Sequence, residues 1–172
     1  VGHASQVSDA GDWFRFDVAS EPLIIARGAD GEVRALLNVC RHRGSKLCLS
    51  KKGKVAKLVC PYHQWTYELS GELIYAGNEM GENFKKDDYP LHKVNCRTAG
   101  GYIFISLAKN PPDIDAFLKD MELYLEPYDL DNAKVAVEST IVEDANWKLV
   151  IENNRECYHC TGSHPELLNS LL

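Results

Sequence analysis

Cys40-Arg41-His42 and, after seventeen further residues, Cys60-Pro61-Tyr62-His63 are the two runs that decide the fold. Each run places one thiol near one imidazole, in the patterns C-x-H and C-x-x-H. Two Cys and two His can hold a two-iron, two-sulfur cluster, with the thiolates on one iron and the imidazoles on the other. The spacing therefore predicts a cluster site whose ligands are Cys40, His42, Cys60 and His63.

A zinc ion is the alternative occupant of this ligand set, because tetrahedral zinc also accepts two Cys and two His. Zinc fingers, however, place two Cys together and two His together. Here a Cys and a His alternate along the chain. This order favours the iron–sulfur cluster.

The residues around the ligands resemble those of Rieske proteins. Rieske proteins of the respiratory cytochrome complexes carry two further Cys, joined in a disulfide, where Ser45 and Tyr62 stand here. The runs Asn38-Val39-Cys40-Arg41-His42-Arg43-Gly44 and Cys60-Pro61-Tyr62-His63-Gln64-Trp65 are instead similar to the cluster domain of Rieske non-haem iron oxygenases. The resemblance implies a [2Fe-2S] cluster as cofactor.

The segments on both sides of the ligands predict short antiparallel strands, because they alternate or form apolar runs between turn signals such as Asp30-Gly31. The expected strands cover residues 13–18, 23–26, 33–37, 66–69, 72–75, 91–97 and 102–107. The cluster ligands then lie on two loops of a rigid sheet, where a redox centre is held near the surface. Residues 1–112 are expected to form an all-β Rieske domain.

Residues 113–172 are expected to form a linker helix and the truncated N-terminal part of a catalytic domain. Pro111-Pro112 marks the boundary, and Asp113 can cap a helix whose apolar residues recur at helical spacing up to Leu125. Alternation over residues 134–142 predicts a strand. The expected fold class is α+β: an all-β cluster domain, followed by the start of an α+β domain that the resemblance implies is of the helix-grip type.

A second group of candidate ligands consists of Glu156, His159 and His164. On an ideal helix Glu156 and His159 lie about 60° apart and share a face, whereas His159 and His164 diverge by about 140°. A Gly and a Pro that flank His164 predict a break, which allows both imidazoles to meet at one metal. Two His and one carboxylate form the facial triad of non-haem Fe(II) oxygenases, which leaves positions open for O2.

This spacing, after the lead-in Asn146-Trp147-Lys148, is similar to the mononuclear-iron segment of Rieske oxygenase α subunits. The resemblance implies that His159 and His164 bind a mononuclear Fe(II), and that an Asp beyond Leu172 is the third ligand. It also implies a catalytic role for Glu156, which bridges to a cluster-ligating His of the neighbouring protomer. Glu156 is expected to orient His159 as well.

Cys157-Tyr158-His159-Cys160 has a second interpretation, as a C-x-x-C redox or zinc motif. A haem attachment would need a His directly after the second Cys, and no zinc partner pair follows. An isolated His is more often a surface or structural residue, but the cluster ligands upstream favour iron binding here.

Glu156 in the context Glu-Cys-Tyr-His-Cys resembles the branch of the family that acts on quaternary ammonium compounds. Residues 53–60 and 152–156 are most similar to demethylases of glycine betaine and proline betaine (stachydrine). The resemblance implies an oxygenase component, a homotrimer, that uses O2 and electrons from a separate NAD(P)H-dependent flavin/ferredoxin reductase. It would N-demethylate a small quaternary ammonium substrate and release formaldehyde.

Two other functions remain open. An aromatic-ring-hydroxylating Rieske dioxygenase would keep all the metals and change only the substrate pocket. A Rieske-type electron-transfer protein explains residues 1–110 equally well, but leaves Glu156, His159 and His164 without a purpose.

The composition narrows the partners and the compartment. A net charge of −6 argues against nucleic acid as a partner, and no apolar run approaches the roughly eighteen residues of a membrane helix. Six Cys are too few for a disulfide scaffold, which favours a cytoplasmic location. The eight basic residues from Arg34 to Lys57, with no acidic residue among them, form a positive collar. The collar could steer an acidic electron donor or include a solvated surface loop.

Overall fold

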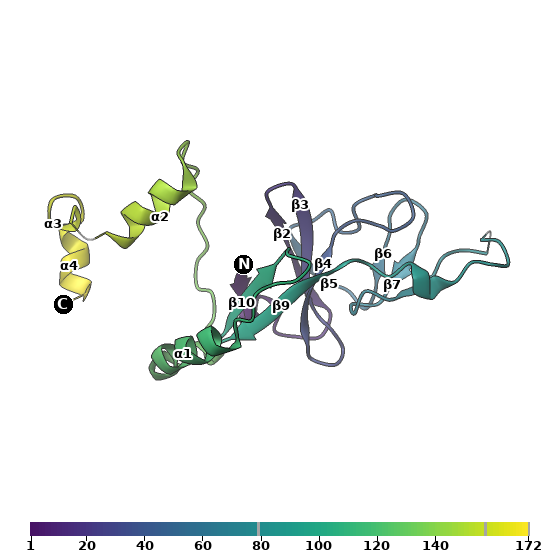
Figure 1. Ribbon diagram of the computed structural model, residues 1–172, viewed down its shortest axis with the longest axis horizontal. Coiled ribbons are helices and arrows are strands. Elements are labelled where there is room, and N and C mark those ends of the chain that lie inside the picture. Colours follow the sequence, from purple (N-terminus) through teal and green to yellow (C-terminus); the bar gives the residue numbers. More distant parts are fainter. Residues whose placement is uncertain (79, 157, 172) are drawn as a thin grey trace. The chain divides into compact units, whose positions relative to one another are not determined.

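Figure 1 shows the computed structural model, which describes residues 1–78, 80–156 and 158–171. The chain forms two compact units, residues 1–136 and 137–172. The described strands and the four candidate cluster ligands belong to the first unit, whereas Glu156, His159 and His164 belong to the second. No helix in the described part of the chain is long and apolar enough to cross a lipid bilayer.

A seven-stranded antiparallel sheet forms the centre of the first unit. Across the sheet the strands are β1 (Gly2–His3), β10 (Tyr102–Ser106), β9 (Lys93–Ala99), β4 (Val33–Leu37), β3 (Glu21–Arg27), β2 (Asp12–Val18) and β5 (Lys52–Lys54). A smaller antiparallel sheet contains β6 (Leu58–Val59), β7 (Thr66–Tyr67) and β8 (Leu73–Tyr75). The expected all-β fold of this part of the chain is confirmed, although the sequence pattern predicts none of β1, β5 and β6.

β3 is buried on both faces because its centre is a continuous apolar run. Leu23 and Ile25 belong to one hydrophobic core, which also contains Ile103 of β10. Ile24 and Ala26 belong to the other core, which also contains the thiols of Cys40 and Cys60 and the ring of Trp65. The second core therefore includes two of the four candidate cluster ligands.

Two loops carry the candidate cluster ligands. The first ligand loop, residues 40–48, follows β4 after Val39, and the second ligand loop, residues 60–65, joins β6 to β7. Both ends of the second loop are therefore fixed by strand pairing, in which Leu58 pairs with Tyr67. The predicted position of the ligands on loops of a rigid sheet is confirmed.

The expected linker helix is α1 (Asp115–Leu125). Asp113 contributes to its start, since its Oδ1 accepts a hydrogen bond of 2.9 Å from the N–H of Asp115. Leu118 is the buried residue of the helix. Short 3-10 helices occupy Ala4–Val7, Lys86–Asp88, Glu126–Tyr128 and Leu130–Asn132 (η1 to η4).

The expected strand at residues 134–142 is wrong, because these residues, all described, form no strand. Val137, Ile141 and Val142 are more than four-fifths exposed, so the alternating pattern has no described neighbouring strand to pair with. The second unit is instead helical, with α2 (Trp147–Arg155), α3 (Cys160–Ser163) and α4 (Pro165–Leu171). The side chain of Asn146 caps α2 by accepting a hydrogen bond from the N–H of Lys148.

Candidate metal centres

The first ligand loop is closed by two backbone hydrogen bonds. The N–H of Cys40 donates to the carbonyl of Ser45 at 2.8 Å, and the N–H of Gly44 donates back to the carbonyl of Cys40 at 2.9 Å. Gly44 has a φ of 72°, a conformation that a residue with a Cβ adopts only at a cost. The tight turn contains His42, which follows Cys40 by two residues.

The buried side chain of Asn38 fixes the far end of this loop. Its Oδ1 accepts hydrogen bonds from the N–H groups of Leu47 and Cys48, each at 2.9 Å. Its Nδ2 donates to the carbonyl of Cys48 at 2.8 Å. Asn38 is fully buried, so it satisfies three backbone groups that water cannot reach.

The second ligand loop repeats the backbone frame of the first. The N–H of Cys60 donates to the carbonyl of Trp65 at 2.8 Å, and the N–H of Gln64 donates to the carbonyl of Cys60 at 2.9 Å. Gln64 takes the place of Gly44 in this frame and has a φ of 60°. Both ligand pairs are therefore held by the same turn geometry.

The four candidate ligands lie together in the first unit. The thiols of Cys40 and Cys60 are almost fully buried and close enough to influence each other. The imidazole centroids of His42 and His63 are 4.6 Å apart, with the rings inclined by 68°. Nδ1 of His42 is buried and, among the described residues, has no hydrogen-bond partner.

This arrangement fits a bridged [2Fe-2S] cluster. A buried, unpartnered imidazole nitrogen is costly unless a metal uses its lone pair. Each iron of such a cluster takes only two protein ligands. The described residues contain no group of three or more His, Cys, Asp or Glu suited to a single metal ion.

Tyr67, in β7, makes contact with one of the candidate thiolates. Its hydroxyl lies 3.3 Å from Sγ of Cys40 and also accepts a hydrogen bond of 3.1 Å from the N–H of Arg41. Because Arg41 occupies the acceptor side of the hydroxyl, its proton is available to Cys40. Burial, and then the contact with Cys40, raises the pKa of Tyr67 far above its ordinary value, so the phenol remains a donor.

Burial also sets the protonation of the free side chains around the site. It raises the pKa of the Cys40 thiol and raises the pKa of Cys48 to about 11. Desolvation, with the nearby His63 and Arg43, lowers the pKa of His42 and favours the neutral imidazole that ligates metals. Cys40 would thus depend on a bound metal to become a thiolate.

The sequence interpretation missed the role of Tyr67 and gave none to Asn38. A Tyr in a short strand beside the ligands is the available signal, since a buried Tyr hydroxyl usually finds a polar partner. Asn38 is recognisable only as a polar residue after the apolar β4. Neither pattern identifies the partner without the fold.

The positive collar is partly neutralised. Lys54 pairs with Asp9 at 2.8 Å, Arg34 pairs with Asp30, and Lys57 pairs with Glu68. The Asp30 carboxylate, whose pKa is lowered to about 2 chiefly by its hydrogen bond from Arg34, stays charged at neutral pH. Steering of an acidic donor stays a prediction, which depends on the remaining basic residues near the ligands.

In the second unit, the structure brings Glu156, His159 and His164 together but not on one helix. The expected shared helical face is wrong, because α2 ends at Arg155 and Glu156 has an extended backbone. The imidazole centroids of His159 and His164 are nevertheless 5.5 Å apart, at the two ends of α3. Oε1 of Glu156 lies 3.5 Å from Nδ1 of His159. The break expected near His164 is confirmed, because α3 ends at Ser163.

Among the described residues of this unit, no further His, Cys, Asp or Glu is placed to bind one metal ion together with the two imidazoles. Two neighbouring imidazoles fit two of the three positions of a facial triad. Cys157, which belongs to the alternative C-x-x-C interpretation, lies outside the described residues.

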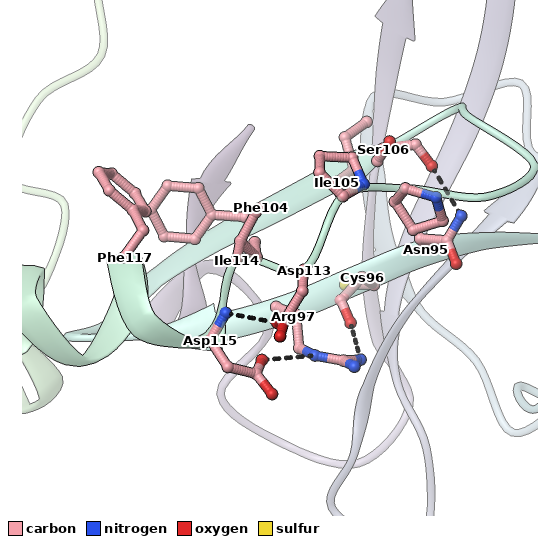
Figure 2. A pocket seen from close by; sticks show the side chains of 12 residues that line it. Asn95, Cys96, Arg97, Phe104, Ile105, Ser106, Asp113, Ile114, Asp115 and Phe117 are labelled. Carbon is pink, nitrogen blue, oxygen red and sulfur yellow. Dashed lines mark hydrogen bonds and ion pairs between the residues drawn. The ribbon is translucent and has the colours of Figure 1, made fainter.

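Figure 2 shows a hollow of about 550 Å³ in the first unit. It lies between β9, β10 and the start of α1, and contains the ion pair of Arg97 with Asp115 at 4.0 Å. None of the four candidate cluster ligands lines it. Its lining residues are Asn95, Cys96, Arg97, Phe104, Ile105, Ser106, Pro111, Pro112, Asp113, Ile114, Asp115 and Phe117.

An all-β domain in which two loops bring two thiols and two imidazoles together is typical of Rieske-type iron–sulfur proteins. Comparison with known families agrees with this class. Residues 1–85 match the Rieske [2Fe-2S] domain, and residues 130–172 match the catalytic domain of ring-hydroxylating alpha subunits. The chain belongs to the Rieske non-haem iron oxygenase alpha subunits, and this membership implies a [2Fe-2S] cluster and a mononuclear iron that uses O2.

Among curated proteins, the chain is 62% identical over its whole length to the glycine betaine monooxygenase oxygenase subunit of Pseudomonas aeruginosa, of which it covers 40%. It is 36% identical, over 99% of its length, to the carnitine monooxygenase oxygenase subunit of Escherichia coli, of which it covers 46%. The chain thus spans less than half the length of these relatives.

Solved structures give the same fold. A quaternary ammonium Rieske monooxygenase in complex with L-carnitine matches with a TM-score of 0.89 and 33% identity, over 100% of this chain and 50% of the other. Naphthalene 1,2-dioxygenase from Rhodococcus matches with a TM-score of 0.85 and 31% identity, over 98% of this chain and 40% of the other. The expected Rieske oxygenase resemblance is confirmed.

Proposed function

We propose that this chain is part of the oxygenase component of an enzyme that N-demethylates a small quaternary ammonium compound, glycine betaine or proline betaine. The observation that carries the proposal is the 62% identity to a glycine betaine monooxygenase oxygenase subunit across both candidate metal centres. The similarity to a carnitine monooxygenase subunit supports the wider substrate class.

The roles of the residues follow from their positions. Cys40 and Cys60 would bind one iron of the cluster, and His42 and His63 the other. In the second unit, His159 and His164 would bind the mononuclear iron. The domain assignment in this proposal is residues 1–112 for the Rieske domain and 113–172 for the linker helix and the first part of the catalytic domain.

Glu156 would act between the two centres of neighbouring subunits. His63 is exposed, whereas the ring of His42 is half-buried and stacked on Trp65, so His63 is the ligand that a neighbouring Glu156 could reach more easily. The carboxylate of Glu156 is half-exposed and lies 3.5 Å from Nδ1 of His159. One carboxylate could therefore hold the imidazole of its own iron ligand and accept a hydrogen bond from His63 of the next subunit.

The cluster would supply single electrons, and the mononuclear iron would activate O2. The balance of the reaction is one O2, two electrons and two protons per N-methyl group. One oxygen atom enters a C–H bond of the methyl group and the other leaves as water. The C–N bond of the resulting carbinolamine then breaks, with release of formaldehyde, a proton and the demethylated amine.

The partners belong to the same proposal. Electrons would come from a separate NAD(P)H-dependent flavin/ferredoxin reductase, and the oxygenase would be a cytoplasmic homotrimer. These assignments are supported by the family resemblance, in which Glu156 joins two subunits.

The test is formaldehyde release by the full-length protein, supplied with a matched reductase, NADH, O2 and one candidate substrate at a time. Glycine betaine, proline betaine, carnitine and an arene are compared. We expect formaldehyde in stoichiometric amount with the NADH consumed, from one betaine. If iron-replete protein yields none from any amine but oxidises the arene, the enzyme is instead a ring-hydroxylating dioxygenase.

A further inference from the structure

The two imidazoles of the proposed cluster site have different neighbours. The ring of His42 lies parallel to the indole of Trp65, with centroids 4.8 Å apart and an angle of 8° between the planes. Trp65 is only 2% exposed. His63 packs instead against Tyr62, at 3.7 Å, and Tyr62 is 62% exposed. The hydrophobic core thus supports only one of the two rings.

Trp65 is held in place by groups other than His42. Phe84 and Tyr89 contact the indole with centroid distances of 5.6 and 5.7 Å, and they stack on each other at 4.9 Å. The carbonyl of Trp65 accepts the hydrogen bond from the N–H of Cys60 that closes the second ligand loop. The indole is therefore a fixed surface against which His42 can rest.

His42 depends on this surface for its orientation. The torsion that rotates an imidazole is broad, so packing or a hydrogen bond must select one ring position. Nδ1 of His42 is buried and has no hydrogen-bond partner in the described part of the chain. The ring of His42 also meets His63 edge-on at 4.6 Å, but His63 is exposed. The parallel contact with the buried Trp65 is therefore the contact that can select the orientation before any metal binds.

We propose that Trp65 is a positioning residue, which holds the imidazole of His42 with its buried Nδ1 directed at the cluster. This inference rests on the proposed cluster ligands. Trp65 comes from the second ligand loop and His42 from the first, so the contact couples the two loops. Loss of the indole would leave the iron bound but allow the ring of His42 to rotate.

The experiment compares Trp65→Leu, Trp65→Phe and the parent full-length protein, each loaded with the cluster and reduced. Pulsed electron–nuclear double resonance measures the coupling of the unpaired electron to each ligand nitrogen. In Trp65→Leu we expect one of the two nitrogen couplings to shift or broaden and the other to stay. Trp65→Phe retains an aromatic face and should restore both. Release of the cluster to a chelator should be about twofold to tenfold faster in Trp65→Leu, the range that the loss of one aromatic stack allows.

Trp13→Leu is the matched control, because Trp13 is buried in the same core but lies in β2. We expect it to leave both couplings unchanged. Two unchanged couplings in Trp65→Leu, or equal changes in Trp65→Leu and Trp13→Leu, would overturn the positioning role while leaving the cluster assignment intact. A parent protein without two nitrogen couplings would instead contradict the proposed ligand set itself.

Discussion

The two ligand loops share one backbone frame, but they place their imidazoles in different surroundings. In each loop the same pair of hydrogen bonds ties the Cys backbone to residues four and five positions later. His42 nevertheless rests on the buried Trp65, whereas His63 is exposed beside Tyr62. The comparison teaches that one imidazole belongs to the core and the other to the surface, where a neighbouring subunit could reach it.

Removing a thiol from either loop should have the largest effect. We expect Cys40→Ser and Cys60→Ser each to lose the cluster, since both loops contribute one proposed thiolate. Cys48→Ser is the matched control, because Cys48 is a buried thiol of the first loop with a raised pKa. Iron and acid-labile sulfide analysis checks this. Retention of the cluster in Cys60→Ser would contradict the expectation that each loop contributes one thiolate ligand.

The loops should differ in how strongly they depend on a single side chain. Asn38→Ala deprives three buried backbone groups of the first loop of their partners, and we expect the free energy of unfolding to fall by about 3 kcal/mol or more. Asn95→Ala, the control, removes two exposed hydrogen bonds and should cost less than about 0.5 kcal/mol. Urea unfolding followed by circular dichroism measures both; equal effects would contradict the role of Asn38.

Tyr67 should make the cluster easier to reduce, because its hydroxyl faces Cys40 on the first loop. A hydrogen bond to a ligating sulfur stabilises the added negative charge of the reduced state. We expect Tyr67→Phe to lower the reduction potential by about 59 mV, which is tenfold in the one-electron equilibrium. Tyr75→Phe, the control, removes the hydroxyl of a half-exposed residue in β8 and should leave the potential unchanged. Potentiometric titration measures the reduction potential of both variants. An unaltered potential in Tyr67→Phe would contradict a hydrogen bond from Tyr67 to the Cys40 sulfur in the loaded protein.

The smallest effect should come from the left-handed residue in each loop. A Cβ on Gly44 meets no atom within 4 Å, so Gly44→Ala should lower the free energy of unfolding by about 1 kcal/mol through backbone strain alone. Gln64 already bears this strain. Gln64→Gly should therefore not destabilise, because relief of strain offsets the greater freedom of Gly in the unfolded chain. Thermal unfolding compares Gly44→Ala with Gln64→Gly. If both substitutions destabilise the protein by similar amounts, the two loops do not share the same backbone strain.

Much of the first unit could be predicted from the sequence because its signals are local. The alternation in β2 and the apolar run in β3 indicate strands without knowledge of their neighbours. β5 gives no such signal, since Lys52–Lys54 is an exposed polar edge strand formed only because β2 lies beside it. Residues 134–142 show the converse, an alternating pattern without a described partner strand.

The candidate ligands were recognisable from their spacing, whereas their supports were not. The contact of Tyr67 with Cys40 joins β7 to the first ligand loop, and the contact of Trp65 with His42 joins the two loops. Both contacts depend on how β6 pairs with β7. The helical face assumed for Glu156 and His159 fails because α2 ends at Arg155. The two side chains still meet, because the chain turns after the helix rather than continuing it.

The reduction potential of the full-length protein tests the central claim most directly, since it reports which side chains bind the cluster. Two His on one iron raise the potential to about −150 to +300 mV, whereas a cluster held by four Cys lies near about −400 mV. We predict a one-electron potential within the first range. A potential near the second value, or a metal centre that cannot be reduced at all, such as zinc, would contradict the ligand set on which the account depends.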